Sequence, residues 1–294
     1  MGISKVIVDL AAWGASVDIA RISRAIDYLT SKRRFYALLY VLGFLVLLPY
    51  ASRGYSWHEM WDVIKDVLVH HAVIYRLVDM GWPSAVLHVL ALALIAAVAV
   101  WGERAARAFD AYAFAAYLMI AVGQGVGFSE RYGLVVLTGN VALTLLVALS
   151  WGWECLVGRN RFRRGFLAPE RLWLAPLAAW AYWSPPEPFK LDPRYLLVGY
   201  FGVSYCFTTP VVLAVMALYY PDVNEPVLRL TAFLGLIYGL YNVVPPLVYL
   251  ALGTYLAEAI WRGTILHLPL LITSAYALAL TLKGRSPTKP ALGR

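Results

Sequence analysis

Apolar residues fill most of the chain in long runs that short charged segments separate. The runs are Leu38–Pro49, Ala85–Trp101, Ala111–Val122, Leu134–Ser150, Leu196–Tyr219, Leu230–Leu252 and Ile265–Leu282. Several approach the ~20 residues that an α-helix needs to cross a ~30 Å hydrocarbon core. The pattern predicts an all-α protein, a polytopic integral membrane helical bundle of about eight transmembrane helices.

Expected crossings follow these runs, and one further segment is marginal. We expect crossings at about 35–51, 82–102, 109–127, 132–156, 172–184, 195–219, 227–252 and 264–282. The segment Leu172–Trp183 covers only about 18 Å as a helix before the Pro-rich stretch 184–188. A crossing there keeps the basic C-terminal tail on the same side as the N-terminus, which favours eight helices over seven.

The basic residues predict the orientation, because loops rich in Lys and Arg stay on the cytoplasmic side. The densest basic stretches are the N-terminal segment and the loop 158–171. We therefore expect a cytoplasmic amphipathic, basic segment at 1–34, a membrane domain at 35–283 and a cytoplasmic basic tail at 284–294. The predicted location is the cell (plasma) membrane, with both termini in the cytoplasm.

Two amphipathic segments predict helices that lie on the membrane surface. Apolar residues recur at helical spacing among charges near 15–30, and Val63, Val67 and Ile74 give the segment 57–80 an apolar side. Such helices bind the bilayer interface through their apolar face.

Composition agrees with this reading. Apolar residues make up 61% of the 294 residues and the mean hydropathy is +0.67. The net charge of +8 lies in loops and tails beside apolar runs, so we expect the lipid bilayer as partner and no nucleic acid.

Cys155 and Cys206 belong to different runs, which argues against a disulfide framework. The scarcity of Asn and Gln is typical of a thermophile.

The most unusual local feature is the stretch Tyr241–Pro246. Prolines at 245 and 246 remove the helical hydrogen bonds to the carbonyls of Tyr241 and Asn242. Hydrocarbon cannot solvate freed carbonyls, so they must face protein, water or an ion. Because broken helices build binding sites in many transporters, the stretch predicts a helix break at a solute site.

Polar side chains at similar expected depths in other runs complete this hypothesis. The candidate substrate-binding residues are Asn242, Tyr241, Asn140, His88 and His267. Polar residues within spans usually face the bundle interior. Structural contacts between helices are the alternative for each of them. A bis-histidine haem between His88 and His267 is a further alternative, and the cofactor is left unknown.

The outer loop holds the candidate metal ligands His58, Asp62, Asp66 and His70 at a spacing of four residues. On a helix, a His–Asp pair at this spacing can bind a divalent metal. The alternative, an interfacial helix with a solvated face, is favoured. The Gly pairs 123/127 and 235/239 match the spacing for close helix packing.

The leading functional hypothesis is a transporter or channel-like permease for a small solute or ion, using a broken helix at 241–246. One alternative is a membrane enzyme or redox subunit, linked to haem or quinone, that acts on a lipophilic substrate. Another is a non-catalytic subunit or anchor of a homo-oligomer or membrane complex. The sequence holds no Ser/His/Asp set and no Cys-x-x-Cys, so whether the protein is an enzyme stays open.

Overall fold

A computed structural model describes residues 19–45, 48–253 and 257–283 in two compact units, 1–40 and 41–294. The first unit contains helix α2 (Ile19–Ser31) and the start of α3 (Arg33–Leu45). Helix α2 confirms the helix expected near 15–30 from residue 19 onward. The remainder of that prediction, and the basic tail at 284–294, lie outside the described residues.

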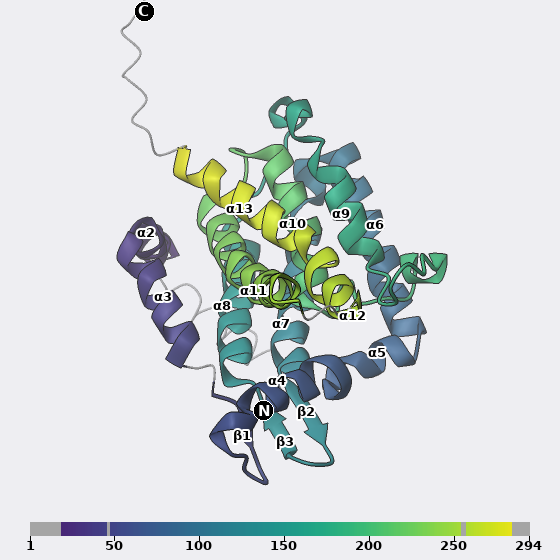
Figure 1. Ribbon diagram of the computed structural model, residues 1–294. Coiled ribbons are helices and arrows are strands. Elements are labelled where there is room, and N and C mark those ends of the chain that lie inside the picture. The colour runs from purple at the N-terminus through teal and green to yellow at the C-terminus, as the bar shows by residue number, and fades with distance from the viewer. Residues whose placement is uncertain (1–18, 46–47, 254–256, 284–294) are drawn as a thin grey trace, which may run out of the picture. The chain divides into compact units, whose positions relative to one another are not determined.

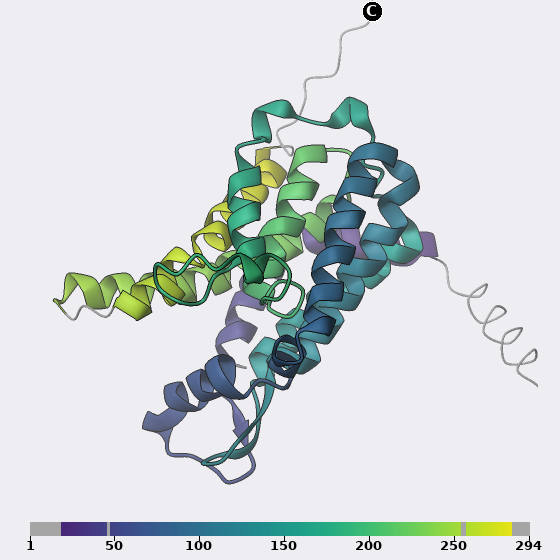
Figure 2. The same ribbon diagram turned by 90° about the vertical axis from the view of Figure 1, so that its right-hand side faces the viewer.

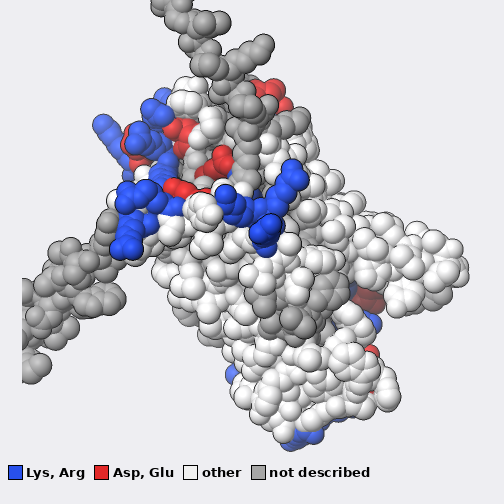
Figure 3. Space-filling model, turned by 90° about the vertical axis from the view of Figure 1, so that its left-hand side faces the viewer, with Lys and Arg blue, Asp and Glu red and all other residues white. Residues whose placement is uncertain are grey.

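Five helical stretches in the second unit are long and apolar enough to cross a membrane (Figure 1). They are α6 (Trp82–Trp101), α7 (Glu103–Gln124), α8 (Thr138–Val157), α11 (Glu225–Ala251) and the stretch Ala257–Leu282. That last stretch joins α12 (Ala257–Ala259), the π-helical turn η7 (Ile260–Ile265) and α13 (Leu268–Lys283). A broad face of the surface carries no charged side chains (Figure 3). The predicted helical membrane protein is therefore confirmed.

The predicted count of about eight crossings is not supported. Helix α3 has 13 residues, α9 (Leu174–Trp183) has 10 and α10 (Tyr205–Tyr219) has 15. Helix α9 ends where the chain reaches the Pro-rich stretch at 185–188. The apolar stretch 195–204, expected to begin a span, has only a 3₁₀ turn, η6 (Pro193–Leu196), before Tyr205. Gly202 has a φ of +79° there, which interrupts a right-handed helix.

The helices of the second unit pack in neighbouring pairs. Helix α7 lies along α8, α11 lies along α13, and α10 contacts α9, α11 and α13 (Figures 1 and 2). Close packing was predicted for the pair 235/239 and is confirmed, since a Cβ on Gly239 would lie 3.0 Å from the Leu271 Cα on α13. The other pair does not join two helices, because Gly127 lies in a strand.

A small antiparallel sheet was not expected from the sequence. Its strands β1 (Tyr50–Ala51), β2 (Val126–Ser129) and β3 (Gly133–Val136) lie in the order β1-β3-β2. Val126 pairs with Val136 and Ser129 with Gly133 in the β2–β3 hairpin, which links α7 to α8.

The predicted single helix at 57–80 is wrong. The chain instead forms five short pieces: η1 (Trp57–Glu59), α4 (Met60–Asp66), the π-helical η2 (Val67–His71), η3 (Val73–Tyr75) and α5 (Arg76–Asp79). Ala72, between η2 and η3, forms an isolated β-bridge with Gly127 of β2. The two backbones approach so closely there that a Cβ on Gly127 would lie 2.6 Å from the His71 carbonyl oxygen.

Candidate functional site

The predicted break at 241–246 is wrong. Helix α11 continues through Pro245 and Pro246 to Ala251. The Asn242 side chain donates to the Tyr238 carbonyl at 2.8 Å, and the Thr264 hydroxyl of η7 donates to the Val243 carbonyl at 3.4 Å. These two bonded carbonyls lie on either side of those that the prolines free, at 241 and 242, and the helix is not interrupted. The end of α11 then extends away from the other helices (Figure 2), with Tyr249 56% exposed.

Irregular backbone lies instead between α9 and α10. Residues 201–204 are buried although they belong to no helix. The Ser84 hydroxyl of α6 donates to the Gly199 carbonyl at 2.8 Å and accepts from the Gly199 N–H at 3.0 Å. The Thr208 hydroxyl accepts from the Gly202 N–H at 2.9 Å. A spanning helix therefore satisfies polar backbone that hydrocarbon could not.

Gln124 joins the end of α7 to the start of α10. Its carbonyl oxygen accepts from the Tyr205 N–H at 3.0 Å, and its amide nitrogen donates to the Ser204 hydroxyl at 3.1 Å. Gln124 is 5% exposed. This chain has a single glutamine, and it lies at the irregular segment.

Two of the predicted site residues are connected to different ends of Tyr238. The Thr144 hydroxyl donates to the Asn140 side chain at 3.2 Å and lies 3.5 Å from the Tyr238 hydroxyl. Asn242 donates to the Tyr238 carbonyl and lies 3.9 Å from the Cys206 sulfur. Asn140, Tyr241 and Asn242 are each half-buried. Asn140 is thus connected to the Tyr238 hydroxyl only through Thr144, whereas Asn242 binds the Tyr238 backbone carbonyl, and a binding role for either residue stays a prediction.

Hydroxyl groups extend this polar interior between α7, α8, α10 and α11. Tyr117 and Thr209 share a hydrogen bond of 3.1 Å, and the Tyr205 hydroxyl donates to the Thr231 carbonyl at 3.0 Å. The Trp151 indole donates to the Thr231 hydroxyl at 3.2 Å. The Tyr205 and Tyr238 rings lie 5.0 Å apart, edge to face, which connects these groups to those around Asn242.

The two histidines occupy separate surroundings. His88 is fully buried, with Nδ1 2.8 Å from the Ser84 carbonyl and its ring against Tyr182 and Phe201. His267 has Nδ1 2.7 Å from the Arg262 carbonyl and its ring against Phe207. Each ring is thus held by a backbone carbonyl and by aromatic neighbours, and a binding role for either histidine stays a prediction.

The candidate metal ligands do not gather. Within 19–45, 48–253 and 257–283, no group of three or more His, Cys, Asp or Glu side chains could hold a metal ion. His58 lies in η1, Asp62 and Asp66 in α4 and His70 in η2, so the expected face of one helix does not exist. Asp66 pairs with His71 at 3.5 Å instead.

A buried polar cluster near the start of α7 was missed by the sequence reasoning. It consists of Asp110, Glu154, Asn160 and Asn224, each at most 2% exposed. We call it the carboxylate cluster. Asn160 donates to Asp110 through its amide nitrogen at 2.8 Å and to Glu154 through its N–H at 2.6 Å. Asn224 donates to Glu154 through its amide nitrogen and to Asn160 through its N–H at 2.7 Å.

Helical periodicity contained the signal for this cluster. Asp110 lies on the same face of α7 as the buried Ala113 and Tyr117, and Glu154 follows Val147 and Trp151 on one face of α8. Residues three or four positions apart share a helix face. Both acids lie near the ends of expected spans, so the hydropathy pattern gave no reason to expect them inside the bundle.

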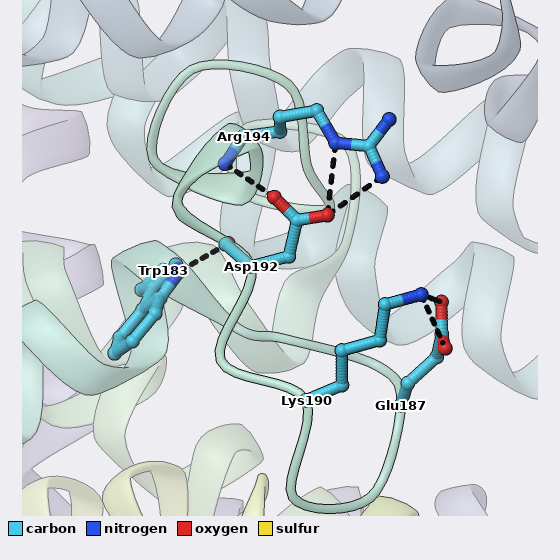
Figure 4. A network of polar contacts seen from close by, with 5 residues as sticks. All are labelled: Trp183, Glu187, Lys190, Asp192 and Arg194. Carbon is cyan, nitrogen blue, oxygen red and sulfur yellow. Dashed lines mark hydrogen bonds and ion pairs between the residues drawn. The ribbon is translucent and has the colours of Figure 1, made fainter.

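Polar contacts also order the loop between α9 and α10 (Figure 4). The Trp183 indole donates to the Asp192 carbonyl at 2.8 Å, and Lys190 pairs with Glu187 at 2.9 Å. Arg194 binds the Asp192 carboxylate through its side chain and its N–H, at 2.6 and 2.9 Å. These hydrogen bonds from Arg194 hold the pKa of Asp192 below its ordinary value.

Comparison of the chain with known protein families, curated proteins and solved structures finds no match.

Proposed function

We propose that this protein carries a small solute or ion across the membrane through the bundle formed by α6, α7, α8, α10 and α11. The observation that supports the proposal is the irregular segment Gly199–Ser204, buried among helices and bonded to Ser84 and Gln124. Non-helical backbone at membrane depth is tolerated where it is enclosed by protein or lines a cavity, and transporters build substrate sites from it.

The solute would bind between this segment and the polar residues around Tyr238. Gln124, Tyr205 and Cys206 are buried at the start of α10, and Asn242 approaches Cys206 from α11. Asn140 approaches the same region through Thr144. Donors and acceptors from four helices therefore lie in this region, which suits a small polar solute better than a lipid.

The orientation in the plasma membrane belongs to the same proposal. The Arg-rich loop 158–171 and both termini face the cytoplasm, and the sheet and the pieces of 57–79 face outward. In this arrangement α9 and α10 are two short crossings, joined by the loop that contains the irregular segment. With the crossing expected at 35–51 and the five long helical stretches, they make the eight proposed crossings.

The test measures solute flux into vesicles that contain the purified protein. Stopped-flow light scattering would compare urea, glycerol, glycine, KCl and NH₄Cl with protein-free vesicles. We expect faster volume recovery for at least one solute, and loss of that increase in Gln124→Leu and Asn242→Leu. The matched control is Ser150→Ala, whose hydroxyl donates to the Val147 carbonyl of its own helix.

Recovery equal to that of protein-free vesicles for every solute would contradict the proposal. Equal loss of flux in Ser150→Ala would also count against it, because the effect would then not depend on the polar interior.

A further inference from the structure

We propose that the carboxylate cluster is a proton-binding site, in which Asp110 holds a proton on Oδ2 next to ionised Glu154. The site is distinct from the polar residues around Tyr238. Its use to drive transport rests on the proposed function, whereas proton binding itself does not.

Burial is the first argument. Asp110 and Glu154 are both fully buried and linked through one residue, Asn160. Two like charges in a low-dielectric interior repel strongly, and each also loses its hydration. A single proton removes one charge and the repulsion together. One carboxyl of a buried, interacting pair therefore keeps its proton to a higher pH than the other.

Unpartnered oxygens are the second, independent argument. Asp110 Oδ2 and Asn224 Oδ1 are buried, and neither meets a hydrogen-bond donor among the residues that the structure describes. Both are acceptors, so they cannot satisfy each other. A proton bound to Oδ2 turns the Asp110 carboxyl into a donor, while its Oδ1 goes on accepting from Asn160.

The charge of one arginine, Arg107, acts on both Asp110 and Glu154. Arg163 pairs with Asp222, and Arg229 pairs with Glu225 on α11. Arg107 of α7 donates to the backbone carbonyls of Glu154 and Cys155.

Two further groups face the cluster from α8 and from the loop that follows it. They are the Cys155 thiol and Arg159, whose backbone reaches Glu154. Neither carries a carboxylate that could compete for the proton.

Aromatic rings close the cluster toward the bundle interior. The Phe109 ring lies 5.5 Å from Phe162 and 6.1 Å from Trp151, and Phe162 lies 5.4 Å from Tyr219. Phe162 and Trp151 are fully buried. Exchange of the proton with water therefore takes place on the side of the Arg-rich loop, next to Arg107, which is exposed.

Infrared spectroscopy of the purified full-length protein tests the proposal without a solute. The C=O stretch of a protonated carboxyl absorbs at a different frequency from the stretches of a carboxylate, and this frequency shifts in D₂O. We expect a buried protonated carboxyl at neutral pH in the wild type and its loss in Asp110→Asn. Asp62→Asn, which changes an exposed acid in α4, should keep the band.

A second variant tests whether the charge of Glu154 holds the proton on Asp110. Glu154→Gln removes the neighbouring charge, so the band should disappear at a lower pH than in the wild type. The wild-type Tm should fall as the pH rises and Asp110 loses its proton. Asp110→Asn mimics the protonated form, so its Tm should not show this fall.

Three results would overturn the proposal. They are absence of the band in the wild type at neutral pH, its survival in Asp110→Asn, and its removal when NaCl replaces choline chloride at fixed pH. The last result would assign the site to a metal cation. A failed flux experiment leaves the infrared result intact, so failure of the proposed function and failure of this inference are distinguishable.

Discussion

Arg163 binds the Asp222 carboxylate with its side chain and with its own backbone N–H. The guanidinium donates from Nη2 at 2.6 Å and from Nε at 3.1 Å, and the N–H donates at 2.9 Å. Asp222 precedes α11, so the pair fixes the Arg-rich loop to the start of that helix. Burial acts to raise the pKa of Asp222, but these hydrogen bonds and the Arg163 charge outweigh it and lower the pKa.

This pair predicts a loss of stability in acid. A carboxyl whose pKa is lowered by folding contributes stability above its unfolded pKa of about 3.9, and the contribution is lost as the pH falls through the folded value. We expect the wild-type Tm in detergent to fall below pH about 4. Asp222→Asn should have a lower Tm at neutral pH and a weaker acid dependence. The same acid dependence in both proteins would show that the pair is not its source.

Asn160→Ala should be strongly destabilising. It leaves Asp110 Oδ1 and the Asn224 N–H, both buried, without their partner. Two such losses cost about 2–6 kcal/mol. Asn140→Ala is the matched control, because Asn140 is half-buried and the change should cost about 1 kcal/mol or less. Unfolding in mixed micelles measures both free energies, and equal costs would contradict the prediction.

Gly239→Ala should weaken the contact between α11 and α13. The added methyl group would lie 3.0 Å from Leu271 Cα and 3.1 Å from its nitrogen, and backbone atoms cannot rotate away. Overpacking of this kind costs about 1–3 kcal/mol of unfolding free energy. Gly165→Ala, with nothing within 4 Å of its Cβ, should be neutral. A Tm unchanged by Gly239→Ala would show that the helices separate easily.

Cysteine labelling tests the proposed orientation. In a chain whose Cys155 and Cys206 are replaced by Ala, Asp62→Cys and Gly165→Cys each provide one exposed thiol. An impermeant maleimide should label Asp62→Cys in intact cells, and Gly165→Cys only after the cells are permeabilised. The opposite pattern would invert the topology.

The sequence predicted the apolar helices well, because their length and hydropathy are local properties. It failed at Pro245 and Pro246, which lie inside α11 without breaking it, with side chains bonded to nearby carbonyls. Asn242 lies four residues after the carbonyl that it binds, and Thr264 comes from another element. A proline marks where a helix can break, and its neighbours decide whether it does.

The carboxylate cluster and the irregular segment were missed for a different reason. Asp110 and Glu154 lie 44 positions apart, and Asn160 and Asn224 bring them together only after α7, α8 and α11 have packed. Similarly, 195–204 has the hydropathy of a helix, and its irregular course depends on the positive φ of Gly202 and on the contacts of Gly199 with Ser84. Hydropathy measures burial and does not distinguish a buried helix from buried loop backbone.

The shortness of α9 has a consequence for the surrounding lipid. At 10 residues it is about 15 Å long, below the ~30 Å thickness of the hydrocarbon core. Leu172 and Trp173, just before this helix, are 52% and 44% exposed, so the chain there reaches the protein surface. Acyl chains beside α9 should therefore shorten or tilt, and this hydrophobic mismatch should thin the bilayer locally. Flux in vesicles of graded acyl length should therefore be highest in short-chain lipid.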